Sequence, residues 1–335
     1  MEDDMIFSDE MVYEPLIDHF SCSLEDLHTA TTLCETINQL DALLSVMTTH
    51  GMSKELLAFA DHDLTLSTAI STIPSLEAYV ADPDVLNVDA AAESVLQSIK
   101  HVSQRFIDAI MSHIVRFRNW YGSATKILGA FSIAILNKGK IKSVDPFYLA
   151  GQATFDWKIL LDPKVVVPAV AAGAVLIALN LARSTPHAIK QALELTLPTD
   201  VQGRAAYISK VSTIFQEVAK IDLKRLGVAT LSERETGKSA RELGYTKEHV
   251  EEIVRDVSIA IDELRRCEFI PEKLETLSRS VEATTSNGKA ALIFLTNVIT
   301  KTMHLAVHDT LKAGHQMQRL DIAVRHVEHT SAIED

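Results

Sequence analysis

Apolar residues recur at steps of three and four along most of this chain, which is the spacing of one face of an α-helix. The clearest segment runs from Asp89 to about Leu136 and contains a coiled-coil-type seam. Its members, spaced 4-3-4-3-4-3, are Ile99, Ser103, Phe106, Ile110, His113, Phe117 and Trp120. We interpret His113 as a hydrogen-bonded core histidine rather than a metal ligand. The pattern predicts one long central helix.

A second apolar stripe precedes it, made of Leu27, Cys34, Ile37, Leu40, Leu44 and Met47. We expect Ser23 to cap this helix with help from Asp26, and Gly51 to end it. The first 20 residues show no clear helical period, and two prolines interrupt the stretch after Gly51. We therefore expect residues 1–88 to form several short helices.

Residues 165–182, VVVPAVAAGAVLIALNLA, are almost entirely apolar, with Asn180 as the single polar side chain. Eighteen residues is the lower limit for a helix that spans a membrane. The small residues suit a tightly packed helix in the centre of a bundle equally well. The composition favours a buried core helix and leaves a membrane-active segment as the alternative.

The C-terminal part reads as helical throughout. Helices are expected from Thr199 or Asp200 to about Asp222, from Thr246 to Cys267, and from Pro271 to near Glu328 with a break at Asn287-Gly288. No segment alternates apolar and polar residues for long enough to indicate a strand. The sequence predicts an all-α fold, an elongated multi-helix bundle with a long central helix and a buried apolar helix.

Composition supports this fold class. Of the 335 residues 47% are hydrophobic, and Gly (12) and Pro (9) are scarce. A disordered chain has few apolar residues, and a collagen-like chain is rich in Gly and Pro, so both classes are excluded. The three cysteines form no CxxC pair, which indicates synthesis in a reducing cytoplasm rather than a disulfide scaffold.

Charge is divided unevenly along the chain. Residues 1–93 contain 19 acidic side chains and one basic residue, Lys54, whereas residues 94–335 carry a net charge of +5. We divide the chain accordingly into an acidic helical N-terminal segment, 1–93, and a main helical bundle, 94–335. Such a segment is either an interaction arm or propeptide, or an acidic helical surface that faces solvent.

No acidic residue occurs between Asp108 and Asp145, and basic residues alternate there with aromatic ones. This composition suits contact with phosphates or lipid headgroups, although a solvated face of a bundle helix would look similar. The residues predicted to make such contacts are Arg105, Arg116, Arg118, Lys126, Lys138, Lys140 and Lys142.

Motifs for catalysis or metal binding are weak. Gly237-Lys238-Ser239 resembles the end of a phosphate-binding loop, but Ser232 stands where that loop needs its first glycine. His304 and His308 lie one helical turn apart, but Leu305 replaces the glutamate of a zinc protease. A weak metal site with His315, His326 and His329 is a minor alternative. We expect no enzyme, no cofactor and no metal.

The run at residues 50–79, HGMSKELLAFADHDLTLSTAISTIPSLEAY, resembles the internal head (inner body) virion proteins of phiKZ-like jumbo bacteriophages. The resemblance lies in three features: a Gly-Ser-x-x-Leu helix start, an aspartate-rich turn followed by leucine, and an Ile-Pro-x-Leu-Glu step. The residues that carry them are Gly51, Ser53, Leu56 and Leu57, then Asp61, Asp63 and Leu66, then Ile73, Pro74, Leu76 and Glu77. A long aromatic and basic helix follows. The resemblance covers about the first 135 residues.

The resemblance implies a virion structural protein in the capsid interior, packaged with the genome and able to be ejected with it. A prohead protease would remove an N-terminal propeptide after a small residue, any residue and Glu. Six sites fit this pattern: Ser8-Asp9-Glu10, Ser23-Leu24-Glu25, Ser53-Lys54-Glu55, Ser75-Leu76-Glu77, Ala91-Ala92-Glu93 and Ala332-Ile333-Glu334. Position favours Ala91-Ala92-Glu93, because cutting there would remove the whole acidic segment. The implied partners are other capsid proteins, the protease and, weakly, packaged DNA. The implied localisation is the capsid interior, after synthesis in the host cytoplasm.

A membrane-active helical protein is the alternative function. In that interpretation residues 165–182 insert into a bilayer, while the basic residues around 105–142 contact headgroups. The two interpretations are compatible, because an ejected protein could contact the host envelope transiently.

Overall fold

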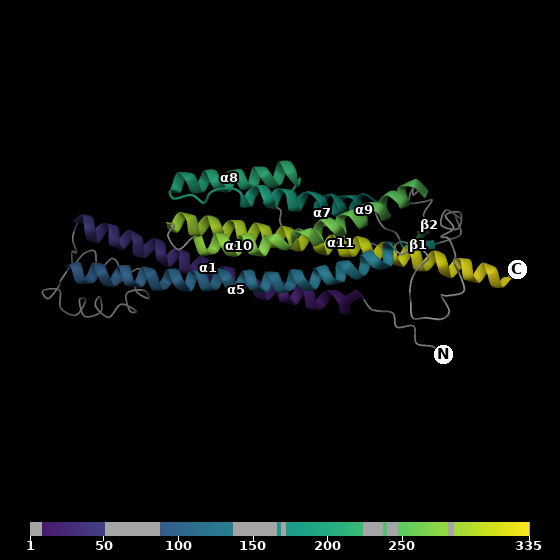
Figure 1. Ribbon diagram of the computed structural model, residues 1–335, viewed down its shortest axis with the longest axis horizontal. Coiled ribbons are helices and arrows are strands. Elements are labelled where there is room, and N and C mark those ends of the chain that lie inside the picture. Colours follow the sequence, from purple (N-terminus) through teal and green to yellow (C-terminus); the bar gives the residue numbers. More distant parts are fainter. Residues whose placement is uncertain are drawn as a thin grey trace. The chain divides into compact units, whose positions relative to one another are not determined.

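A computed structural model of the chain describes residues 9–50, 88–136, 166–168, 172–223, 237–239, 247–280 and 285–334. Seven α-helices occur in this part (Figure 1): α1 (Asp9–His50), α5 (Val88–Leu136), α7 (Ala172–Leu193), α8 (Val201–Val218), α9 (Lys247–Arg265), α10 (Phe269–Ser280) and α11 (Ser286–Glu334). A 3-10 turn, Arg266–Glu268, joins α9 to α10. The predicted all-α fold is confirmed.

One short strand pair accompanies the helices in the described residues. β1 (Val166–Pro168) pairs antiparallel with β2 (Gly237–Ser239), with Val167 opposite Lys238. These two three-residue segments are too short to show the alternation that marks a strand in sequence, and they leave the all-α fold class unchanged. Gly237-Lys238-Ser239 thus has an extended backbone rather than that of a phosphate-binding loop.

The chain forms two compact units. The first comprises residues 1–118, 196–208 and 271–297, and the second comprises 119–195, 209–270 and 298–335. Four helices, α5, α8, α10 and α11, contribute residues to both units. The acidic helix α1 lies wholly within the first unit, together with the first part of α5 and the start of α11.

The core of the first unit contains the apolar stripe of α1. Its buried members are Leu27, Ala30, Cys34, Ile37, Leu40, Leu43 and Met47, which confirms the predicted stripe except that Leu43 is buried in place of Leu44. The helix begins at Asp9, not at Ser23, so the predicted cap is wrong.

The long helix α5 begins at Val88 and ends at Leu136, as predicted to within one residue. Phe106, Ile110, Phe117 and Trp120 of the seam are buried. His113 is 1% exposed, which agrees with a core position. Ile99 and Ser103, at the start of the seam, are partly exposed and line a pocket.

In the second unit, α7 packs against α9, and Arg183 contributes an ion pair to Asp256 at 2.6 Å. The Tyr121 hydroxyl of α5 donates a hydrogen bond to the backbone carbonyl of Leu264. The helix predicted over 165–182 starts only at Ala172, because the valine-rich beginning supplies β1. Leu179, Leu181 and Ala182 of its end are buried, as a core helix requires.

The predicted ends of the C-terminal helices need small corrections. Asp200 caps α8, since its Oδ1 accepts the Gly203 N–H at 2.7 Å. That helix ends at Val218 rather than near Asp222, and Lys220 follows with a φ of 56°. Asn287 and Gly288 do not break a helix but lie in the first turn of α11, which continues to Glu334.

Candidate functional site

The candidate site is the contact between the acidic helix α1 and the basic helix α5. Figure 1 shows α1 beside the first part of α5, and one aspartate of α1 joins them. The carboxylate of Asp26 accepts a hydrogen bond from the Ser112 hydroxyl at 3.2 Å and lies 3.3 Å from Nε of Arg116. Asp26 therefore binds α5 instead of reaching back to a helix cap at Ser23.

Helix geometry places both partners of Asp26 on one stripe of α5. Ser112 and Arg116 are four residues apart and so share a face. Arg105 lies eleven residues before Arg116, which is close to three full turns, and it belongs to the same stripe. The Arg116 side chain is 44% exposed, while that of Asp26 is only 17% exposed. The ion pair is thus accessible to solvent mainly through its cation.

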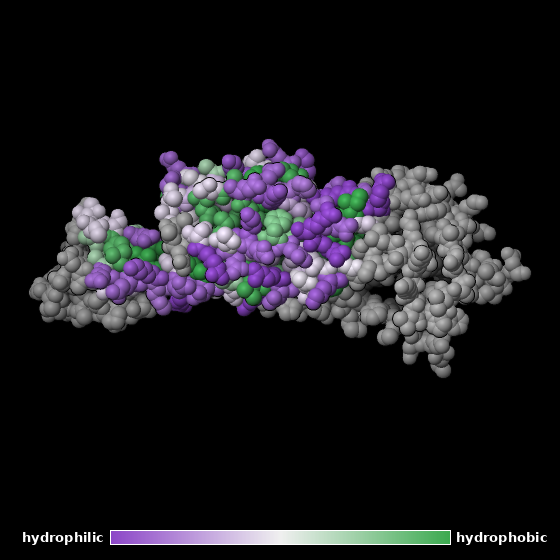
Figure 2. Space-filling model, in the orientation of Figure 1, coloured by the Kyte–Doolittle hydropathy of each residue, from purple (hydrophilic) through white to green (hydrophobic). Residues whose placement is uncertain are grey.

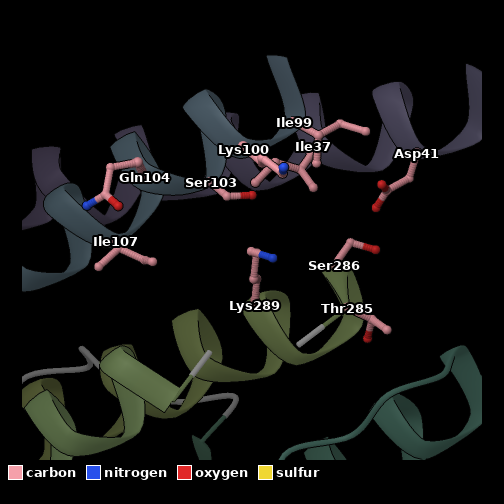
Figure 3. A pocket seen from close by; sticks show the side chains of 10 residues that line it. All are labelled: Ile37, Asp41, Ile99, Lys100, Ser103, Gln104, Ile107, Thr285, Ser286 and Lys289. Atoms are coloured by element: carbon pink, nitrogen blue, oxygen red, sulfur yellow. The ribbon is translucent and has the colours of Figure 1, made fainter. Parts of the chain in front are cut away.

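A pocket of about 510 Å³ in the same unit is lined by both polar and apolar side chains (Figure 3). Three helices line it: α1 with Ile37 and Asp41, α5 with Ile99, Lys100, Ser103, Gln104 and Ile107, and the start of α11 with Ser286 and Lys289, preceded by Thr285. In the close-up, the amine of Lys289 and the carboxylate of Asp41 both extend toward the space between the helices. The pocket therefore combines one acidic and two basic side chains.

Burial of Lys289 and the nearby charge of Asp41 have opposite effects on the pKa of the lysine. The residue is only 4% exposed. Burial lowers the pKa of its ammonium group, and the negative charge of Asp41 opposes this effect. Burial likewise raises the pKa of Asp41, while Lys289 opposes that shift. The two charges stabilise each other, and Asp41 is the acidic group on α1 that faces this lysine.

Cys34 lies beside this pair without reactive character. Burial raises the pKa of its thiol to about 11, which keeps it protonated at neutral pH. Its Sγ lies 3.6 Å from the Ser286 carbonyl and donates to it. This contact ties α1 to the first turn of α11, so the cysteine serves packing rather than chemistry.

The histidine pair of α11 lies in the second unit, against an aromatic ring. His304 and His308 stack with ring centroids 6.0 Å apart, and Trp120 lies 5.3 Å from His304. Burial lowers the pKa of His304 to about 4, with a smaller contribution from His308. Among the residues that the structure describes, no three His, Cys, Asp or Glu side chains are grouped to hold a metal ion. The side chains of His315, His326 and His329 lie outside the described part.

The predicted phosphate contacts have different surroundings. Arg105 and Lys126 are exposed on α5, Arg116 pairs with Asp26, and Arg118 pairs with Glu275 of α10 at 2.5 Å. Lys138, Lys140 and Lys142 lie outside the described residues. The aromatic residues between them do not share the basic surface, because Phe117, Trp120 and Tyr121 are buried. Base stacking on these three rings is therefore excluded, and contact of the basic side chains with phosphates or lipid headgroups stays a prediction.

The predicted processing site lies near the start of α5. Ala91 and Glu93 are in its first two turns, and the Glu93 side chain is exposed. Val95, two residues later, is buried completely. A protease that binds an extended substrate would have to unwind these first turns, which are the weakest part of a helix.

Within the described residues, one helical segment is long and apolar enough to cross a membrane, and it is Ser286–Leu311. Inside the protein 61% of its most apolar window is buried, as is usual for the core helix of a soluble protein. The face of the described part seen in Figure 2 carries hydrophilic side chains interleaved with hydrophobic ones. Insertion by residues 165–182 stays a prediction.

Two features of the site escaped prediction from sequence, the partners of Asp26 and the burial of Lys289. Both depend on contacts between residues far apart in the chain, for which one sequence carries no pattern.

Comparison with family models, with curated proteins and with solved structures found no match for this chain.

Proposed function

We propose that this chain is a structural protein of the interior of a bacteriophage capsid, packaged with the genome, and that residues 1–93 are a propeptide. The division of charge at residue 93 carries the proposal. The acidic segment has a net charge of −18, whereas the remainder has +5. Its resemblance over residues 50–79 to internal head proteins agrees with this division.

The physical basis is the opposing interaction of the two parts with packaged DNA. Phosphates repel an acidic segment and attract lysine and arginine, so the intact chain would avoid nucleic acid during assembly. Loss of the acidic segment would leave a mildly cationic helical protein next to the genome. A charge of +5 is too small for condensation of DNA, which favours a space-filling role over a histone-like one.

The packing of α1 adds a condition to this proposal. Seven of its apolar residues are buried, so α1 is part of a core and not a free arm. Burying each of the five Leu, Ile and Met side chains among them contributes about 1.5–3 kcal/mol. Processing would therefore have to remove a well-packed helix, and the mature protein would expose the surface that α1 now covers.

The decisive experiment is peptide mapping and intact-mass spectrometry of this protein in purified phage particles. We expect a species that starts at Ser94, which would support both the capsid location and the propeptide. A full-length chain in the particles would support the location and contradict the propeptide. Absence of the chain from the particles would overturn the proposed function.

A further inference from the structure

We propose that Asp26 of α1 masks a phosphate-binding stripe on α5, formed by Arg105, Ser112 and Arg116, and that displacement of α1 exposes this stripe to DNA. The inference rests on the proposed function only for the identity of the polyanion, which is packaged DNA. The mask itself follows from the contacts between the two helices.

The stripe has the groups that bind phosphate. Guanidinium groups and hydroxyls are common donors to phosphate oxygens in protein–DNA contacts. Arg105 and Arg116 are both exposed, and eleven residues of helix separate them by about 17 Å. The Ser112 hydroxyl lies between them on the same stripe. Such a row of donors contacts the DNA backbone without reading its sequence.

The mask occupies the same donors. The carboxylate of Asp26 accepts from Ser112 at 3.2 Å and pairs with Arg116 at 3.3 Å, so it holds two of the three groups that a phosphate would use. The helix that carries it has eight acidic residues and no lysine or arginine between Asp9 and His50. α1 thus competes for the donors through Asp26 and repels a polyanion through its remaining charge.

Other charges on α5 distinguish this stripe from its surroundings. Arg118 pairs with Glu275 of α10, so displacement of α1 does not release it. Asp108 lies four residues before Ser112 and so on the same face of α5. It is exposed, Gln104 donates to its carboxylate at 3.1 Å, and it stays in place when α1 leaves. The gain in phosphate binding is therefore specific to Arg116 and Ser112, and Arg105 adds to it.

The test measures binding of the full-length chain to a fluorescent 30-base-pair DNA duplex by anisotropy, between 50 and 200 mM NaCl. We compare Asp26→Asn with Glu25→Gln, because both remove one negative charge from neighbouring positions of α1 and only the first removes the carboxylate that pairs with Arg116. We expect Asp26→Asn to bind DNA at least about fivefold more tightly than Glu25→Gln at 50 mM NaCl. Its salt dependence should be steeper by about one phosphate contact.

A second substitution tests whether Arg116 is the group that gains DNA binding in Asp26→Asn. Adding Arg116→Gln to Asp26→Asn should return the affinity to that of the unmodified chain. The mask is refuted if Asp26→Asn and Glu25→Gln agree within twofold, if the double variant binds as tightly as Asp26→Asn, or if none of the variants binds DNA. Asp26→Ser serves as a second unmasking variant, and circular dichroism establishes that each chain is folded.

The outcome is separable from that of the proposed function. Mass mapping of particles tests location and processing, and neither affects DNA binding by the purified chain. A negative binding result beside a species that starts at Ser94 would reject the mask and keep the virion role. A positive binding result with no such protein in particles would keep the mask and reject the virion role.

Discussion

At the scale of single residues, side chains whose charge conflicts with their surroundings are the most informative. His304 lies between Trp120 and His308, where burial lowers its pKa to about 4. Folding therefore favours the neutral ring, while the unfolded chain takes up a proton near pH 6.5. The stability contributed by the neutral ring is fully present above pH 6.5 and is lost progressively as the pH falls toward 4.

We predict that substituting His304 by Gln removes most of this acid sensitivity. In the unmodified chain the histidine should cost on the order of 2–3 kcal/mol of unfolding free energy between pH 6.5 and 4. Urea unfolding at a series of pH values measures the effect, with His308→Gln as the matched control on the same helix. Equal slopes for His304→Gln and the unmodified chain would contradict the prediction.

The position of a side chain is predictable from sequence when it depends on that residue's own chemistry. It is not predictable when it depends on a partner far away in the chain. The sequence predicts His113 in the core, and this side chain is buried. The sequence also predicts that Asp26 caps a helix locally, but its carboxylate binds α5. A local cap and a distant ion pair use the same side chain, so no single sequence distinguishes them. Lys289 was not singled out, because nothing in its sequence neighbourhood indicates that three helices enclose it.

At the scale of elements, the apolar period predicted the helix interiors more accurately than it predicted most of the helix ends. The period of α5 fixed both of its ends to within one residue or so, since the seam is long and regular. The start of α1 lies at Asp9, 14 residues before the predicted start at Ser23. The valines before α7 formed a strand, for which their β-branched side chains are suited.

The end of α8 offers a direct test of backbone strain. Lys220 has a φ of 56°, a conformation that costs an L-residue with a side chain about 1–2 kcal/mol relative to glycine. We predict that Lys220→Gly raises the unfolding free energy by about 0.5–1 kcal/mol, the remainder being offset by the greater freedom of glycine in the unfolded chain.

The same experiment needs a control for the loss of a lysine. Lys220→Ala removes the charge and keeps the strain, so it should be neutral or slightly destabilising when both variants are followed by thermal unfolding. A stabilisation of equal size in both variants would show that charge, and not backbone conformation, is responsible.

At the scale of the whole molecule, the central fact is that the acidic segment contributes to a hydrophobic core. The charge division was visible in the sequence, but its two interpretations, an arm or an acidic helical face, could not be separated there. In the structure α1 has buried apolar residues on one face and acidic residues elsewhere, so an acidic helix surface is present within the segment proposed as a propeptide.

This packing predicts that cutting the chain after Glu93 does not by itself release α1. With the apolar stripe buried, the fragment should co-elute with residues 94–335 in size-exclusion chromatography at micromolar concentration. The measurement uses the full chain, cut by a protease specific for an introduced site at Glu93, with the uncut chain as reference. Separate elution of the fragment under native conditions would contradict the prediction.

The covalent link between α1 and α5 sets how often α1 returns once it has left. In the intact chain the return is intramolecular and independent of protein concentration, whereas after a cut it becomes a bimolecular encounter. A capsid is a small closed volume in which a retained fragment would stay concentrated and rebind. Cleavage alone would then leave the arginines of α5 covered. They would become available only when the fragment is degraded or leaves the capsid.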